Sequence, residues 1–324
     1  LEDCRARRVE TLRQWRRRRT EIFQGFQAVA GTLPAHARPR PRWDLLAETD
    51  CAEYVRRDIV YEPEPGSRTP AFLLLPRAAL QGRRCPVALC LHQTHPAGRK
   101  VVVGLGQSPD DEYGVELVRR GYVCLAPAYP LLADYAPDVE GLGYASGTLK
   151  AVWDNLRGLD LIESLGLMEQ GRVLAIGHSL GGHNAIFTAA HDPRIRGVIT
   201  SCAFDSFQDY MNGNLTGWVQ TRYMPRLKAY LGRPAEVPFD FPELLGSLAP
   251  RAVFVSAPVG DTNFRWQSVA RIAQAVEPVY ALHGAEGEGR FRVVHPDVGH
   301  RFPPEVRAEA YAFVERGGAR SRRW

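Results

Sequence analysis

The sequence predicts an α/β protein with a mostly parallel central sheet and helices on both of its faces. Short apolar runs such as 86–91 alternate along the chain with longer segments of helical periodicity, which is typical of βαβ units. These runs are continuously apolar, as expected for strands that are buried on both faces. With 324 residues, 45% hydrophobic and 24% charged, the chain is long enough for one large globular domain with extensions.

Residues 1–50 are predicted to form an N-terminal helical arm and a connector. Apolar residues recur with helical spacing from Val9 to Phe26, and Gly31 and Pro34 end this pattern. The proline-rich segment 34–41 is the connector. We expect the helix to pack its apolar stripe on the main domain rather than on a membrane surface.

Residues 51–324 are predicted to form the main domain. Its first two strands are joined by a turn-like segment rich in proline and glutamate, which favours an antiparallel pair. The elements that follow keep the βαβ rhythm. The predicted strands are 54–61, 71–75, 86–91, 122–126, the run that begins at Val173, 197–202, 252–256 and 291–294, and the predicted helices include about 146–165 and 304–315.

An insertion at about 203–249 interrupts this rhythm, with dense aromatic and proline residues and no clear strand. It begins at the carboxyl end of a predicted strand, where ligands bind in open α/β sheets, so we expect a cap over the site. The alternative is an excursion packed on the sheet edge. Its aromatic residues suggest an apolar or ring-bearing ligand, although core packing would give the same composition.

Charge and cysteine content argue against several classes of protein. The net charge of +5 comes mainly from arginine clusters at 16–19 and 320–323, and without a recognition motif we expect no nucleic-acid partner. No apolar stretch approaches the roughly 20 residues of a membrane span. The six cysteines show no CxxC spacing, and His92 and His95 alone make a poor site, so we expect no metal.

The compartment and the assembly are less constrained. No signal peptide is visible, so we expect a cytoplasmic protein, with secretion as the alternative if a leader was removed before Leu1. A homo-oligomer is among the assemblies that the sequence allows.

The segment 173–182 predicts a nucleophile. Four strand residues are followed by Gly177-His178-Ser179-Leu180-Gly181 and then by a helical run. A serine between two glycines at such a junction can be presented on a sharp, strained turn. The G-x-S-x-G pattern alone is weak, but the strand before it and the helix after it are the required context, so we predict Ser179 as a catalytic nucleophile.

Serine needs a base and an acid that orients the base. His300 lies between the last predicted strand and the last predicted helix, and Asp261 lies just past the strand 252–256. We therefore predict Asp261 and His300 as the partners of Ser179. Asp205 is the main rival acid, and Asp297 is too near the base in sequence. The other histidines considered, each less suitably placed, are His178, His183 and His295.

An oxyanion hole is expected from two backbone N–H groups. One is that of Leu180, directly after the nucleophile, and the other comes from the loop 92–98. We predict Thr94 as the second donor, with Gln93 as the alternative.

Together these residues resemble the α/β-hydrolase fold, and more narrowly the dienelactone hydrolase, acetyl xylan esterase and dipeptidyl aminopeptidase-like group. The resemblance covers about residues 50–316 and implies the triad Ser179, Asp261 and His300 without a cofactor. Many relatives have His-Gly where this chain has His92-Gln93. The resemblance does not identify the substrate of this chain, because this fold supports many different reactions. The matching segments are 177–182, 107–111, 121–127, 260–264 and 297–302.

The sequence therefore predicts a serine hydrolase that cleaves a small-molecule carboxylic ester through an acyl-enzyme. A peptidase of the same fold would use the same residues and is the first alternative. A catalytically silent binding module is the alternative from another class, and dehalogenase chemistry is disfavoured because it uses a carboxylate as nucleophile.

Overall fold

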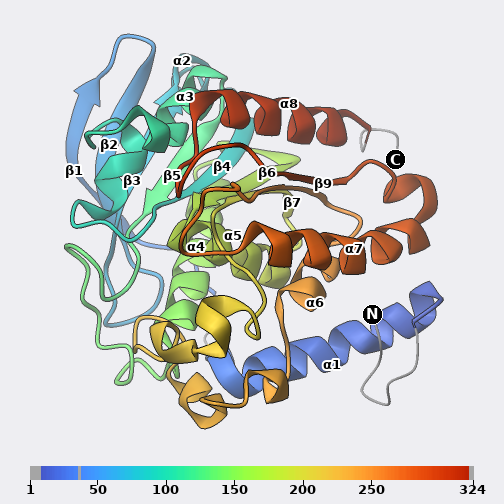
Figure 1. The fold of residues 1–324 in the computed structure, drawn as a ribbon. Helices are drawn as coiled ribbons and strands as arrows, with labels where there is room; N and C mark the ends of the chain where they lie inside the picture. The colour runs from blue at the N-terminus through green and yellow to red at the C-terminus, as the bar shows by residue number, and fades with distance from the viewer. Residues whose placement is uncertain (1–8, 36–37, 321–324) are drawn as a thin grey trace.

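A nine-stranded sheet is the centre of the computed structural model, which describes residues 9–35 and 38–320 (Figure 1). Residues 321–323 of the predicted arginine cluster lie outside the described residues. The strands follow the order β1-β2-β3-β5-β4-β6-β7-β8-β9. Their bounds are β1 Trp43–Asp50, β2 Tyr54–Tyr61, β3 Thr69–Pro76, β4 Cys85–Leu91, β5 Val123–Pro127, β6 Met168–His178, β7 Ile195–Ser201, β8 Ala252–Ser256 and β9 Phe291–Val294.

The sheet is antiparallel at one end and parallel elsewhere. β1, β2, β3 and β5 pair antiparallel in turn, and all pairs from β5 to β9 are parallel. The predicted antiparallel pair β2–β3 and the mostly parallel sheet are thus confirmed. The sequence predicts no strand before Tyr54, yet β1 forms there. Seven of its eight residues are exposed, so it lacks the apolar pattern by which a strand is recognised.

Helices cover both faces of the sheet (Figure 1). The side chains of β6 alternate between two core clusters, with Val173 and Ala175 in one and Leu174 and Ile176 in the other. The cluster with Val173 includes residues of α1 (Leu12–Ala30), α4 (Gly147–Ser164), α5 (Leu180–His191), α6 (Phe241–Gly246) and α7 (Trp266–Leu282), and the cluster with Leu174 includes residues of α3 (Tyr113–Arg119) and α8 (Pro304–Arg320).

No helix in the described ranges is long and apolar enough to cross a membrane.

The N-terminal helix α1 packs on the main domain, as expected. It begins with a capping box between Thr11 and Gln14 and ends at Gly31, whose φ of 97° suits glycine. The buried ring of Phe26 lies 5.3 Å from that of Phe187 and 5.2 Å from that of Phe239, between centroids. The arm therefore contributes to the main hydrophobic core.

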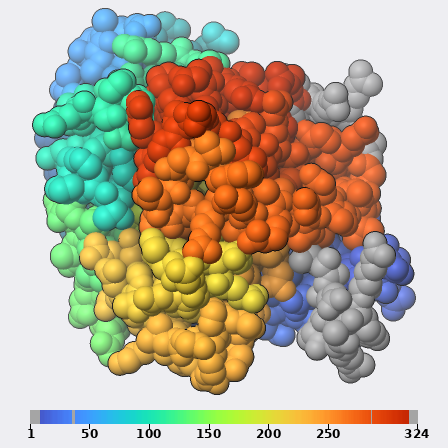
Figure 2. Space-filling model, in the orientation of Figure 1, coloured from blue at the N-terminus to red at the C-terminus, as the bar shows by residue number. Residues whose placement is uncertain are grey.

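The insertion at 203–249 contains short helical turns, the helix α6 and, within the described residues, no strand. Figure 2 shows it in yellow to light orange, covering the lower part of the visible face. Its phenylalanines are buried in the core, so the packing alternative explains most of its aromatic content. These core residues are Phe204, Phe207, Phe239 and Phe241, together with Trp218.

Candidate active site

Ser179 lies on a strained turn between β6 and α5. Its backbone has φ 52° and ψ −120°, a conformation that non-glycine residues rarely adopt. A Cβ atom on Gly181 would lie 1.8 Å from the Leu91 carbonyl oxygen, and one on Gly177 would lie 2.1 Å from the Gly181 carbonyl carbon. Only glycine fits at these two positions, so the sequence G-x-S-x-G forms the predicted turn.

Asp261 and His300 form a hydrogen-bonded pair. His300 Nδ1 is 3.0 Å from both carboxylate oxygens of Asp261. The carboxylate also accepts the backbone N–H groups of Asn263 at 2.8 Å and Phe264 at 3.2 Å, which fix its orientation. Burial by itself raises the pKa of Asp261, but the hydrogen bond and charge of His300, with these N–H groups, lower the pKa below its usual value. Asp261 is therefore an ionised carboxylate that holds the imidazole of His300.

Backbone hydrogen bonds join the loop after β8, which carries Asp261, to the loop after β9, which carries His300. The N–H of Val259 donates to Pro296 O at 3.0 Å, and the N–H of Gly260 donates to Val298 O at 3.0 Å. A Cβ on Gly260 would lie 2.8 Å from that Val298 oxygen, so glycine permits the close approach. The loops after β8 and β9 thus continue the pairing of the strands beyond the sheet.

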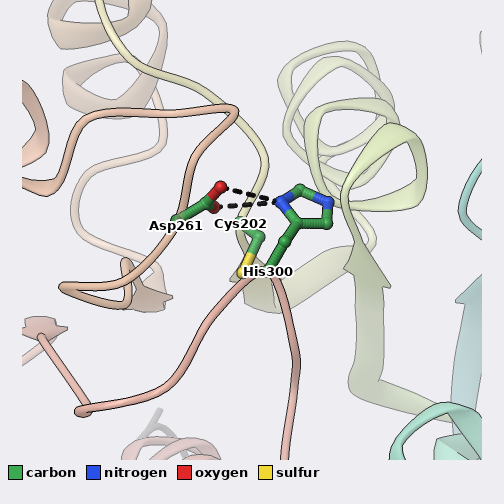
Figure 3. Close-up of side chains that lie close together, drawn as sticks. All are labelled: Cys202, Asp261 and His300. Carbon is green, nitrogen blue, oxygen red and sulfur yellow. Dashed lines mark hydrogen bonds and ion pairs between the residues drawn. The ribbon is translucent and has the colours of Figure 1, made fainter.

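Cys202, the residue directly after β7, lies close to this pair (Figure 3). Its sulfur and ligand atoms of Asp261 and His300 all lie within 4.8 Å of one another. These atom types can bind a metal ion, but the hydrogen bond of the pair already engages the imidazole and the carboxylate. Burial, with the charge of Asp261, raises the pKa of the thiol well above its usual value. Cys202 is therefore a protonated packing residue rather than a nucleophile.

A cavity of about 230 Å³ opens beside Ser179. Leu180 and Thr94, the predicted oxyanion donors, both line it, whereas Gln93 does not. Leu180 is the first residue of α5, so its N–H has no acceptor within the helix. The insertion supplies part of the wall of this cavity beside Ser179. The lining residues are Thr94, Ser179, Leu180, His183, Tyr210, Gly217, Trp218, Gln220, Tyr223, Asn263 and Phe264.

His92 anchors the loop that carries Thr94. Its Nδ1 lies 2.8 Å from Gln93 O, and its Nε2 accepts the backbone N–H of Tyr129 at 3.1 Å. Burial lowers the pKa of His92 to about 4, so the ring is neutral, with Nδ1 as donor. Both nitrogens are engaged, which leaves none for a metal shared with His95. No motif or spacing in the sequence indicates this anchoring role of His92.

Asp205, the rival acid, does not contact the imidazole of His300. It is 2% exposed and accepts the backbone N–H of Arg265 at 3.2 Å. Its Oδ1 has no partner within the described ranges, and burial is the main cause that raises its pKa to about 7. Asp297 is exposed in its loop, and His295 Nδ1 is bonded to Ala257 O at 2.8 Å. The structure thus pairs His300 with Asp261.

His300 lies near the cavity that contains Ser179. The ring of Phe264, a lining residue, has its centroid 6.1 Å from that of His300. The buried ring of His178, the residue before Ser179, has its centroid 4.8 Å from that of His300. In Figure 3 the Nε2 edge of His300 is turned away from Asp261. Among the hydrogen bonds of the described residues none joins Ser179 to His300, and such bonds are often long before substrate binds.

The sheet order, the strained serine turn and the acid and histidine loops after β8 and β9 define the α/β-hydrolase fold, and the chain adopts it. A solved glucuronoyl esterase from Solibacter usitatus superposes with a TM-score of 0.77 at 19% identity, covering 97% of this chain and 96% of that one. A carbohydrate esterase family 15 glucuronoyl esterase from Caldicellulosiruptor kristjansonii gives 0.72 at 17% identity, covering 99% and 89%. An acetyl xylan esterase from Paenibacillus sp. R4 gives 0.61 at 16%, covering 93% and 92%.

One curated protein is similar in sequence over almost the whole chain. It is named "Putative hydrolase YtaP", from Bacillus subtilis (strain 168), and is 26% identical over 311 residues. The match covers 92% of this chain and 98% of that protein. No family model matches the chain.

Proposed function

We propose that the protein is a serine hydrolase that cleaves a carboxylic ester. Ser179 Oγ attacks the acyl carbon while His300 takes the hydroxyl proton, which it then gives to the leaving alcohol. Asp261 orients the imidazole, and the N–H groups of Leu180 and Thr94 stabilise the oxyanion. A water molecule, deprotonated by His300, then hydrolyses the acyl-enzyme. His300 gives the proton of this water to Ser179 Oγ as the acid is released, which restores the free enzyme.

One observation carries this proposal. The strained Ser179 lines the cavity, and the hydrogen-bonded pair of Asp261 and His300 lies next to it, because Asp261 bonds the lining residues Asn263 and Phe264. A turn with this cost in free energy, on the order of 1–3 kcal/mol, is typical of functional sites. The similar solved structures with glucuronoyl and acetyl xylan esterase activity favour an ester over an amide as substrate.

The cavity favours a small substrate group. Its volume of about 230 Å³ is below the roughly 300–1,000 Å³ of pockets that bind drug-sized ligands. Either the acyl or the alcohol part of the ester therefore fits as a short chain or a single ring, while the other part extends toward solvent.

A fluorophosphonate probe tests the nucleophile. We expect the probe to label the wild-type protein at Ser179 and to leave Ser179→Ala unlabelled. Turnover of p-nitrophenyl acetate should fall by about 10³-fold or more in that variant. Ser164→Ala, at the end of α4, is the matched control and should behave like the wild type. Equal labelling of wild type and Ser179→Ala would refute the proposal.

The choice between ester and amide needs a separate comparison. We expect p-nitrophenyl esters to be turned over and aminoacyl p-nitroanilides to be inert at the same enzyme concentration. Efficient anilide hydrolysis that is lost in Ser179→Ala would instead identify a peptidase with the same residues.

A further inference from the structure

Two polar atoms on residues that line the Ser179 cavity have no hydrogen-bond partner within the described part of the chain. They are Nδ1 of His183 and Nε1 of Trp218. The two side chains are 4% and 5% exposed. Buried polar groups are nearly always hydrogen-bonded, because an unpaired one has lost its hydration without compensation. Both nitrogens are covered while the cavity is empty, so a ligand supplies the missing partners once the two side chains turn toward it.

The two side chains belong to one cluster that joins the nucleophile helix to the insertion. His183 lies one turn after Ser179 on α5, so the two share a helix face, and its backbone N–H bonds Ser179 O at 3.3 Å. The Trp218 ring meets the imidazole edge to face, with centroids 4.8 Å apart and an interplanar angle of 85°. Tyr223 lies 5.9 Å from both rings.

The chemistry of these groups defines the ligand. Burial lowers the pKa of His183 to about 3, so its imidazole is neutral, with one donor nitrogen and one acceptor nitrogen. Trp218 adds a donor. A hydroxyl group, which both donates and accepts, matches this set.

The wall of the cavity also restricts charge. None of its lining residues, all of which the structure describes, is a lysine, arginine, aspartate or glutamate. A carboxylate or an ammonium group would therefore lose its hydration here without gaining a counter-ion. This favours an uncharged ligand.

We propose that His183 and Trp218 form a polar subsite that binds an uncharged, hydroxyl-bearing group of the ester and sets the specificity of the reaction. This inference rests on the proposed hydrolase function. It assigns a substrate class, neutral hydroxylated esters, and two specificity-determining residues that lie outside the triad and the oxyanion hole.

Matched pairs of esters test the subsite on each side of the bond. The alcohol pair is a monoacetate of methyl xylopyranoside against cyclohexyl acetate, and the acyl pair is p-nitrophenyl glycolate against p-nitrophenyl acetate. We expect the wild type to prefer the hydroxylated member of at least one pair by about tenfold in kcat/KM, the effect of one or two hydrogen bonds. The pair that shows the preference identifies the part of the ester that enters the cavity.

Variants connect that preference to the two residues. His183→Phe and Trp218→Phe should bring the kcat/KM ratio of the preferred pair close to one, while His183→Gln, which keeps a donor and an acceptor, should retain part of it. His191→Phe is the matched control, because this histidine lies on the same helix outside the cavity and bonds Phe187 O at 2.8 Å. It should leave the ratio unchanged. A packing role would change stability, measured by thermal unfolding, without changing the ratio.

The outcomes separate this inference from the proposed function. If the wild type labels at Ser179 and turns over esters but shows a ratio near one in both pairs, the subsite is refuted and the hydrolase stands. Retention of the full preference by both phenylalanine variants would also refute it. If no ester is turned over and Ser179 is not labelled, both proposals fail.

Discussion

In the proposed triad, one carboxylate orients the imidazole of His300. Asp261 holds His300 Nδ1 at 3.0 Å, whereas Asp205 bonds the Arg265 backbone. We predict that Asp261→Asn lowers kcat for p-nitrophenyl acetate by about 10³- to 10⁴-fold, because the amide can favour the wrong tautomer of the imidazole. Asp205→Asn is the matched control and should retain activity within about tenfold. The opposite ranking in steady-state kinetics would assign the orienting role to Asp205.

We expect Asp205 to affect how the free energy of unfolding depends on pH. Its folded-state pKa of about 7 is raised above the ordinary 3.8, chiefly by burial. Between about pH 4 and pH 7 the folded state therefore keeps a proton that the unfolded state has released, so this group makes stability fall as pH rises. The slope is at most about 1.4 kcal/mol per pH unit.

Asp205→Asn cannot ionise and removes this dependence. We predict that its free energy of unfolding, relative to the wild type, improves between pH 5 and pH 8 in urea titrations. The charge of Asp205 also contributes to the raised pKa of the buried Asp240, about 7, so the variant lowers the pKa of Asp240 and this second effect adds to the first in the same direction. A difference that does not change with pH would show that Asp205 is ionised across this range.

At the scale of elements, the serine turn depends on the contact between α5 and β4. A Cβ on Gly181 would meet the backbone of Leu91, which cannot move without shifting the loop that carries Thr94. We predict that Gly181→Ala loses about 3 kcal/mol of stability or more, together with most of the esterase activity. Denaturant titration and p-nitrophenyl acetate turnover measure the two effects.

Gly197→Ala in β7 provides the comparison for this turn. A Cβ there would lie 3.3 Å from the flexible side-chain end of Leu174, and the backbone is ordinary for other residues. We expect it to cost within about 1 kcal/mol and to retain activity. Equal effects of the two substitutions would mean that the turn tolerates a methyl group.

The elements that the sequence predicts best are those with a periodic apolar pattern. The strands β2, β8 and β9 have their predicted bounds, and β8 is the clearest case because all five of its residues are buried, with a continuous apolar run over 252–255. The exposed strand β1 carries no such pattern. At the site, the chain order of strand ends was enough to predict the pairing of Asp261 with His300. The anchoring role of His92 depends on the packing of β4 against the loop after β5, which local sequence does not encode.

At the scale of the whole molecule, the insertion and the N-terminal helix α1 both pack in the core beside the candidate site. The phenylalanines of the insertion pack inward, while Tyr210 and Tyr223 line the cavity, so one segment both seals the core and shapes the site. The composition of the insertion shows many aromatic residues, but it does not show which of them pack in the core and which line the cavity. That assignment depends on which side chains face the sheet in the folded protein.

The arm should unfold together with the rest of the protein. Phe26 on α1 is 1% exposed and packs against Phe187 of α5 and Phe239 of the insertion. We predict that Phe26→Ala lowers the free energy of unfolding by about 3–5 kcal/mol, the usual cost of removing a buried aromatic ring. The half-buried Phe23 is the matched control, and its alanine variant should cost less. Urea titrations followed by tryptophan fluorescence and by esterase activity should give one coincident transition, shifted to lower urea by Phe26→Ala. If α1 were an independent appendage, the activity transition of Phe26→Ala would coincide with that of the wild type.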